Sequence, residues 1–90
     1  MKIKTGFVLE KVGEEYLAVA VGNRAKEFSG FVRLNQSGAY FWKLLSEGDV
    51  TKEELVNAAL RDFEGVTEEQ LSADVDNLLK ALIDGDIIEK

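Results

Sequence analysis

Residues 31–45 read Phe-Val-Arg-Leu-Asn-Gln-Ser-Gly-Ala-Tyr-Phe-Trp-Lys-Leu-Leu, and this stretch decides the fold. Its first four residues are types that favour a pleated strand. Asn35 is a preferred helix N-cap, because its side-chain oxygen can accept a hydrogen bond from an N–H that the first turn leaves unpaired. After it, small and apolar residues recur at helical spacing: Gly38, Phe41, Trp42 and Leu45. The stretch predicts a strand that passes directly into an amphipathic helix, with Gly38 allowing the first turn to approach the sheet closely.

Two more strands are predicted upstream, at residues 7–12 and 16–21, joined by a hairpin connection that contains Gly13. One face of the second strand carries only Tyr16, Ala18 and Ala20, and its small residues indicate a face that is either solvated or closely covered. Residues 1–5 are expected to be a short polar lead that is frayed at its start. Residues 22–30 are expected to be an irregular connection, in which Phe28 is interpreted as a plug for the sheet edge rather than a ligand contact.

Two capping boxes predict two more helices. Thr51 and Glu54 open a helix that Gly65 ends, and Thr67 and Gln70 open a longer helix through about Asp84. The apolar stripe of the longer helix consists of Leu71, Val75, Leu78 and Leu82, widened by Leu79 and Ile83. Residues 86–89 are expected to form a short extended tail that packs back on the domain.

Strands followed by helices indicate a single α+β domain over residues 1–90, winged-helix-like, with a three-stranded antiparallel sheet followed by three helices. A meander is the simplest order of the strands, and it leaves the strand at residues 31–34 on an open edge. The unpaired N–H and C=O groups of such an edge are a template for another strand. Either the fold covers this edge or a partner uses it.

Composition excludes most enzyme chemistry. The chain has no cysteine and no histidine, so the usual zinc ligands and the commonest general base are missing. Paired carboxylates such as Glu53 with Glu54 and Glu68 with Glu69 fall in the first turns of helices, where the helix dipole favours negative charge. The sequence therefore predicts neither catalysis nor a metal site nor a cofactor.

Charge is uneven along the chain. Residues 1–45 carry seven basic and four acidic side chains, a net charge of +3, whereas residues 46–90 carry four basic and thirteen acidic ones, a net charge of −9. The overall charge of −6 disfavours nucleic acid as a partner. No apolar run is long enough to span a membrane, and no secretory segment is recognised, so a cytoplasmic location is the expectation.

Two functions remain open from the residues alone. The leading hypothesis is peptide binding by β-strand addition at the open edge, beside the last helix. The alternative is an acidic winged-helix interaction domain of a transcriptional or other regulatory complex. A homodimer that pairs two copies of the open edge is a third outcome.

The motif Leu34-Asn-Gln-Ser-Gly-Ala39, followed by Trp42 and Leu44-Leu45, resembles the signature of the PqqD-like family of peptide-recognition domains. The resemblance implies an adaptor, not an enzyme, that binds the leader segment of a ribosomally synthesised precursor peptide. It also implies that the leader is presented to a modifying enzyme, often a radical SAM protein. The contact residues that it implies lie on the third strand and third helix: Phe31, Val32, Arg33, Leu34, Leu71, Val75, Asp76, Leu78, Leu79, Lys80 and Leu82.

Overall fold

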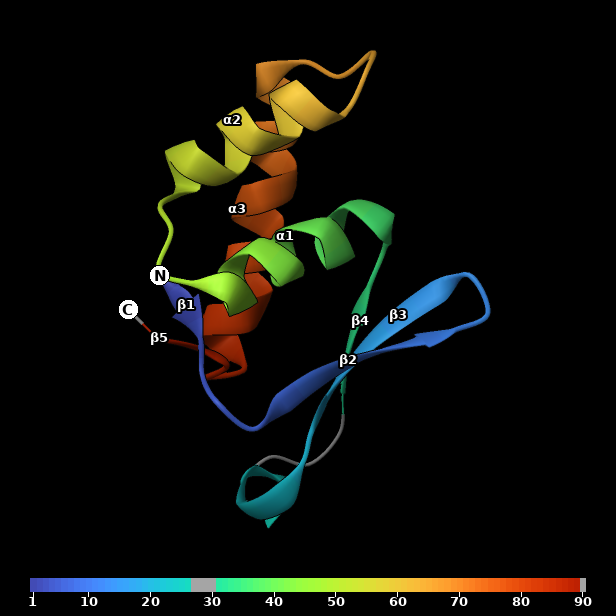
Figure 1. Cartoon of the computed structure of the whole chain (residues 1–90), viewed down its shortest axis with the longest axis vertical. Helices are drawn as coiled ribbons and strands as arrows, with labels where there is room; N and C mark the ends of the chain where they lie inside the picture. The colour runs from blue at the N-terminus through green and yellow to red at the C-terminus, as the bar shows by residue number, and fades with distance from the viewer. Residues whose placement is uncertain (27–30, 90) are drawn as a thin grey trace.

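The computed structural model describes residues 1–26 and 31–89. The elements, in chain order, are β1 (Lys2–Ile3), β2 (Phe7–Val12), β3 (Glu15–Ala20), the 3₁₀ helix η1 (Gly22–Lys26), β4 (Phe31–Leu34), α1 (Gln36–Glu47), α2 (Lys52–Asp62), α3 (Glu68–Asp84) and β5 (Ile88–Glu89). Figure 1 shows the three helices gathered on one side of the sheet. The predicted α+β fold, three antiparallel strands followed by three helices, is confirmed.

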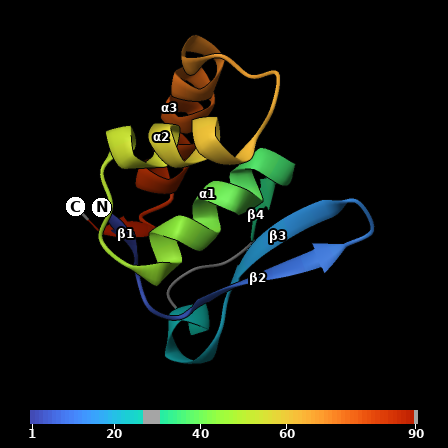
Figure 2. The same ribbon diagram turned by 45° about the horizontal axis from the view of Figure 1, so that its top comes forward.

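The main sheet is a meander in the order β2-β3-β4, with both pairs antiparallel. Ala18, at its centre, pairs with Leu9 on one side and with Val32 on the other, and its side chain is fully buried. The face that carries Ala18 is therefore the closely covered one, because small side chains there let a helix approach. In Figures 1 and 2, α1 lies between this sheet and α2.

The predicted helix starts are confirmed. Oδ1 of Asn35 accepts a hydrogen bond of 2.7 Å from the backbone N–H of Gly38, which begins α1. Thr51 and Thr67 each form a complete capping box, so both α2 and α3 begin where the sequence indicates. The helices then bury one continuous core, whose largest fully buried side chains are Phe41, Leu45, Leu55, Leu82, Ile87 and Val75.

The expectation of a frayed lead at residues 1–5 is wrong. Lys2 and Ile3 form β1, which pairs antiparallel with β5, and the N–H of Lys4 donates to the carbonyl of Ile87 at 2.9 Å. The predicted packing of the C-terminal tail is confirmed by the same pairing, with Ile87 and Ile88 buried. The lead is ordered because the tail supplies the backbone partners that a terminal segment lacks on its own.

The connection after β3 contains the short 3₁₀ helix η1, where the sequence predicts only irregular structure. Phe28, interpreted as a plug for the sheet edge, lies outside the described residues. Across residues 1–26 and 31–89, no helix has the length and apolar character needed to cross a membrane.

Candidate functional site

β4 is an edge strand. Within the described part of the chain it pairs with β3 along one side, and no strand pairs with its other side. In an antiparallel pair, alternate residues direct their N–H and C=O groups toward the partner and the others direct them away. Part of the β4 backbone is therefore available to an added strand, as the sequence predicts.

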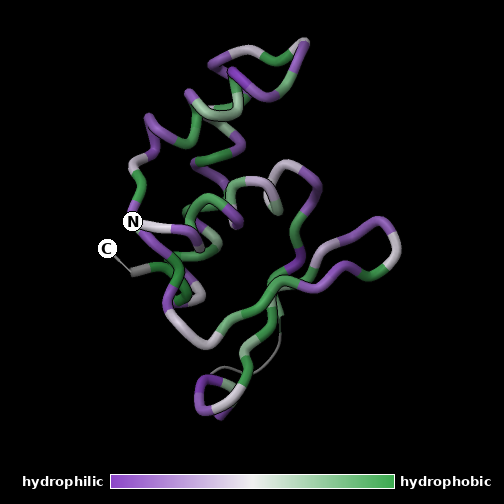
Figure 3. The backbone as a smooth tube through the Cα atoms, in the orientation of Figure 1, coloured by the Kyte–Doolittle hydropathy of each residue, from purple (hydrophilic) through white to green (hydrophobic). Residues whose placement is uncertain are grey.

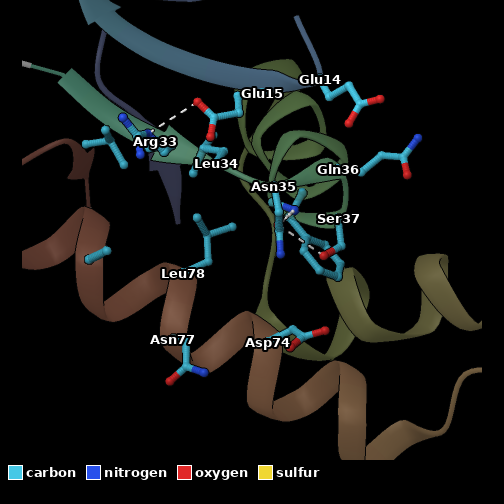
Figure 4. A pocket seen from close by; sticks show the side chains of 14 residues that line it. Glu14, Glu15, Arg33, Leu34, Asn35, Gln36, Ser37, Asp74, Asn77 and Leu78 are labelled. Atoms are coloured by element: carbon cyan, nitrogen blue, oxygen red, sulfur yellow. Dashed lines mark hydrogen bonds and ion pairs between the residues drawn. The ribbon is translucent and has the colours of Figure 1, made fainter. Parts of the chain in front are cut away.

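A groove of about 640 Å³ lies along this free edge, between β4 and α3. Four segments line it: the β2–β3 hairpin, β4, the first turns of α1, and α3. Figure 4 shows side chains from these segments around the space between β4 and α3. The lining residues are Glu14, Glu15, Val32, Arg33, Leu34, Asn35, Gln36, Ser37, Gly38, Phe41, Asp74, Asn77, Leu78 and Ala81.

One face of α3 forms a wall of the groove. Its residues are Asp74, Asn77, Leu78 and Ala81, at i, i+3, i+4 and i+7, which places them on a single helical face. Of the four, only Leu78 is buried, at 8% exposed. The wall therefore borders the core stripe of the same helix and shares one residue with it.

The groove is apolar along its middle and polar at one end. Val32 and Leu34 on β4 and Leu78 and Ala81 on α3 supply apolar lining. In Figure 4, Leu78 lies below Leu34, whereas Asp74 lies nearer the first turn of α1. The hairpin adds Glu14 and Glu15, and Figure 3 shows this hairpin tip as hydrophilic beside hydrophobic strands. Three carboxylates and one guanidinium, that of Arg33, line the groove, a net charge of −2.

Arg33 is the single cation among the described lining residues, and it has an acidic neighbour. Its Nε lies 3.5 Å from Oε2 of Glu15, and both side chains are more than half exposed. An ion pair with that exposure contributes about 0–1 kcal/mol to stability. The pair therefore adds little to the stability of the fold.

Four predicted contact residues lie in the groove: Val32, Arg33, Leu34 and Leu78. Phe31 does not line it. Phe31 pairs with Val19 at the end of β4 farther from α1 and is 54% exposed. It shares a face of β4 with Arg33, which does line the groove, so its place along the strand separates the two residues.

The other predicted helix residues lie elsewhere. Leu71, Val75, Leu79 and Leu82 are core residues, at most 8% exposed, because the main apolar stripe of α3 faces α1 and α2. The structure therefore places these four residues in the core and not in the wall of the groove. Asp76 pairs with Lys52 of α2 at 2.8 Å, and Lys80 is exposed on α3 outside the lining.

Ten lining residues were not predicted as part of a site: Glu14, Glu15, Asn35, Gln36, Ser37, Gly38, Phe41, Asp74, Asn77 and Ala81. The helical spacing of Asp74, Asn77, Leu78 and Ala81 was the available signal on α3. That spacing did not stand out, because the neighbouring stripe of leucine and valine on the same helix is more hydrophobic and indicates the core.

The site is suited to binding. Among the described residues, no group of acidic side chains comes together in a way that would hold a metal ion, and no buried side-chain polar atom lacks a hydrogen-bond partner. A free strand edge beside an elongated apolar groove provides backbone pairing and side-chain burial, the two elements that recognise an extended peptide.

Fold and site define a small winged-helix-like domain with a groove along a free sheet edge. Residues 9–88 match the family described as coenzyme PQQ synthesis protein D (PqqD), and the chain belongs to this family. It is also similar to a solved structure described as TbiB1 in complex with the TbiA(beta) leader peptide. That similarity has a TM-score of 0.73 and 25% sequence identity, and covers 99% of this chain and 95% of the other. No curated protein matches the chain.

Proposed function

We propose that this domain binds the leader segment of a ribosomally synthesised precursor peptide as an added strand on β4. The observation that carries the proposal is the free edge of β4 beside a groove of about 640 Å³. Membership of the PqqD family supports it, as does the similarity to a structure that contains a leader peptide.

Backbone pairing alone is too weak to hold a flexible peptide. Each hydrogen bond contributes about 0.5–1.5 kcal/mol, and β4 is four residues long. Immobilising each flexible side chain of the peptide costs about 0.5–1.5 kcal/mol. Burial of alternate peptide side chains against Val32, Leu34 and Leu78 must therefore supply much of the affinity and the selectivity.

The domain acts as an adaptor without a cofactor of its own, and a modifying enzyme supplies the chemistry. A radical SAM protein is the partner that the family resemblance favours. We place the domain in the cytoplasm, where ribosomes make precursor peptides. The acidic character of α3, in which Lys80 is the only basic residue, argues against the alternative of DNA recognition.

Selection of peptides from a displayed random library on the whole chain tests the proposal. Ala81→Trp fills the groove from an exposed position on α3, and Ile83→Trp is the matched control, because Ile83 is exposed on the same helix outside the lining. Peptides selected on the wild type should bind I83W equally and bind A81W at least about tenfold more weakly, a loss of about 1.4 kcal/mol. Equal binding to A81W would overturn the proposal.

A proline scan across residues 31–34 tests the mode of binding. Proline removes one backbone N–H, so the scan should contain a substitution that abolishes peptide binding and leaves the thermal unfolding midpoint nearly unchanged. If every variant that loses binding is also unfolded, strand addition loses this support. Sedimentation at two concentrations, with and without the selected peptide, tests whether two copies pair through β4 instead.

A further inference from the structure

The groove carries two carboxylates, Glu14 and Asp74, that have no ion-pair partner within residues 1–26 and 31–89. We infer that the peptide held in the groove has a lysine or arginine side chain at the position beside them. This inference rests on the function proposed above and specifies the chemistry of the peptide.

The two carboxylates come from opposite walls. Glu14 belongs to the β2–β3 hairpin and Asp74 to α3, and both line the groove (Figure 4). Within the described residues, neither has a hydrogen-bond or ion-pair partner, whereas Glu15 pairs with Arg33 at 3.5 Å and Asp76 with Lys52 at 2.8 Å. Negative charge at this end of the groove is therefore not neutralised by the domain itself.

The first turn of α1 lies at the same end of the groove. Its positive end could attract an acidic peptide side chain instead of a basic one. A helix N-terminus carries about half a positive charge, which would favour an acidic peptide side chain. Here the cap Asn35 already occupies the N–H of Gly38, and no acidic or basic residue lies in that turn. Two full negative charges exceed this partial positive charge, so the sign of the local field favours a cation.

The position along the peptide follows from the order of the lining. Leu78 lies opposite Leu34, whereas Asp74, one helical turn earlier, lies toward Asn35 and Ser37 (Figure 4). A strand added to β4 would thus bury apolar side chains along Val32 and Leu34 and place the cation where β4 passes into α1. The inferred recognition sequence is an apolar segment with a basic residue at one end.

The charge contributes selectivity more than affinity. Both carboxylates are exposed, and an exposed ion pair changes an affinity by about 1.5- to fivefold. Two such pairs together would change it by about two- to 25-fold. Because salt screens exposed charges, the preference should shrink at high ionic strength.

The test uses the double variant E14Q/D74N of the whole chain. The matched control is E64Q/D84N, which removes the same two charges from exposed positions outside the groove. Random peptides of about twelve residues are selected on the wild type and on both variants, and A81W identifies those that depend on the groove. Lysine or arginine should be enriched at one aligned position on the wild type and on E64Q/D84N, and the enrichment should vanish on E14Q/D74N.

A synthetic copy of a selected peptide then measures the coupling between its basic side chain and the two carboxylates. Replacing its cation with methionine should weaken binding about two- to 25-fold on the wild type and leave binding to E14Q/D74N unchanged. Groove-dependent peptides without a basic preference, or with one that E14Q/D74N does not alter, would overturn this inference and leave the proposed function standing. The absence of any groove-dependent peptide would overturn both.

Discussion

Gly38, in the first turn of α1, packs directly against Leu34, the last residue of β4. A Cβ atom added at Gly38 would lie 3.3 Å from Cβ of Leu34, tighter than ordinary van der Waals contact, and 3.0 Å from Oδ1 of Asn35. This contact brings the start of the helix against the end of the strand. It thereby places both elements on the same groove.

Gly38→Ala should lower the free energy of unfolding by about 1–3 kcal/mol, because the added methyl group overpacks this contact. In an unconstrained helix the same change would be stabilising by about 1 kcal/mol. Chemical unfolding followed by Trp42 fluorescence measures the difference. Gly48→Ala is the control, since nothing lies within 4 Å of a Cβ there, and it should change stability by less than about 0.5 kcal/mol. A G38A variant more stable than the wild type would contradict the close packing.

Asp86 connects α3 to β5 with a positive φ of 58°, a conformation that aspartate, asparagine and glycine tolerate best. Asp86→Ala should therefore be less stable than Asp86→Asn by about 1 kcal/mol, although both variants lose the ion pair with Lys4 at 2.7 Å. Thermal and chemical unfolding of the two variants measure the difference. Equal stability would show that the backbone conformation at this position imposes no cost.

Tyr40 links α1 to α2 through a hydrogen bond of 2.5 Å from its hydroxyl to Oδ2 of Asp62. Desolvation, followed by this hydrogen bond and the charge of Asp62, raises the pKa of Tyr40 to about 12 from an ordinary value of 10.0. A raised pKa means that the folded state holds the proton more tightly. The stability from this group is thus complete below pH 10.0 and is lost as the pH rises toward about 12.

Carbon-13 NMR of the tyrosine rings should show Tyr40 titrating near pH 12, and Asp62→Asn should lower that pKa. In Tyr40→Phe, which has no hydroxyl to ionise at this position, stability should fall less as the pH rises from 10.0 toward about 12. A Tyr40 pKa near 10.0 in the folded wild type would contradict the role assigned to desolvation and Asp62.

Binding of a groove-dependent peptide should slow hydrogen exchange selectively in β4. The amides that point away from β3 should gain protection, whereas those already bonded to β3 should change little, because an added strand bonds only to the free edge. Amide exchange followed by NMR resolves the four residues. In A81W the same peptide should produce no protection, and uniform protection of the wild-type strand would argue against strand addition.

Local signals in the sequence predicted most of the fold. The cap at Asn35 and the capping boxes at Thr51 and Thr67 involve residues within a few positions of one another. They can therefore be recognised without knowledge of the tertiary structure. The pairing of β1 with β5 was not predicted, because two-residue strands at opposite ends of the chain carry no local pattern. Their pairing depends on where the helices leave the two ends.

The sequence by itself determined the class of the domain, the starts of its helices and the presence of a strand with an open edge. It also determined a composition without histidine or cysteine. Only the tertiary structure decided which face of α3 borders that edge. Leu71, Val75 and Leu82 are at most 2% exposed and take the core, which turns Asp74, Asn77 and Ala81 toward the groove. The chemistry of the groove thus follows from how the core packs, which local patterns do not specify.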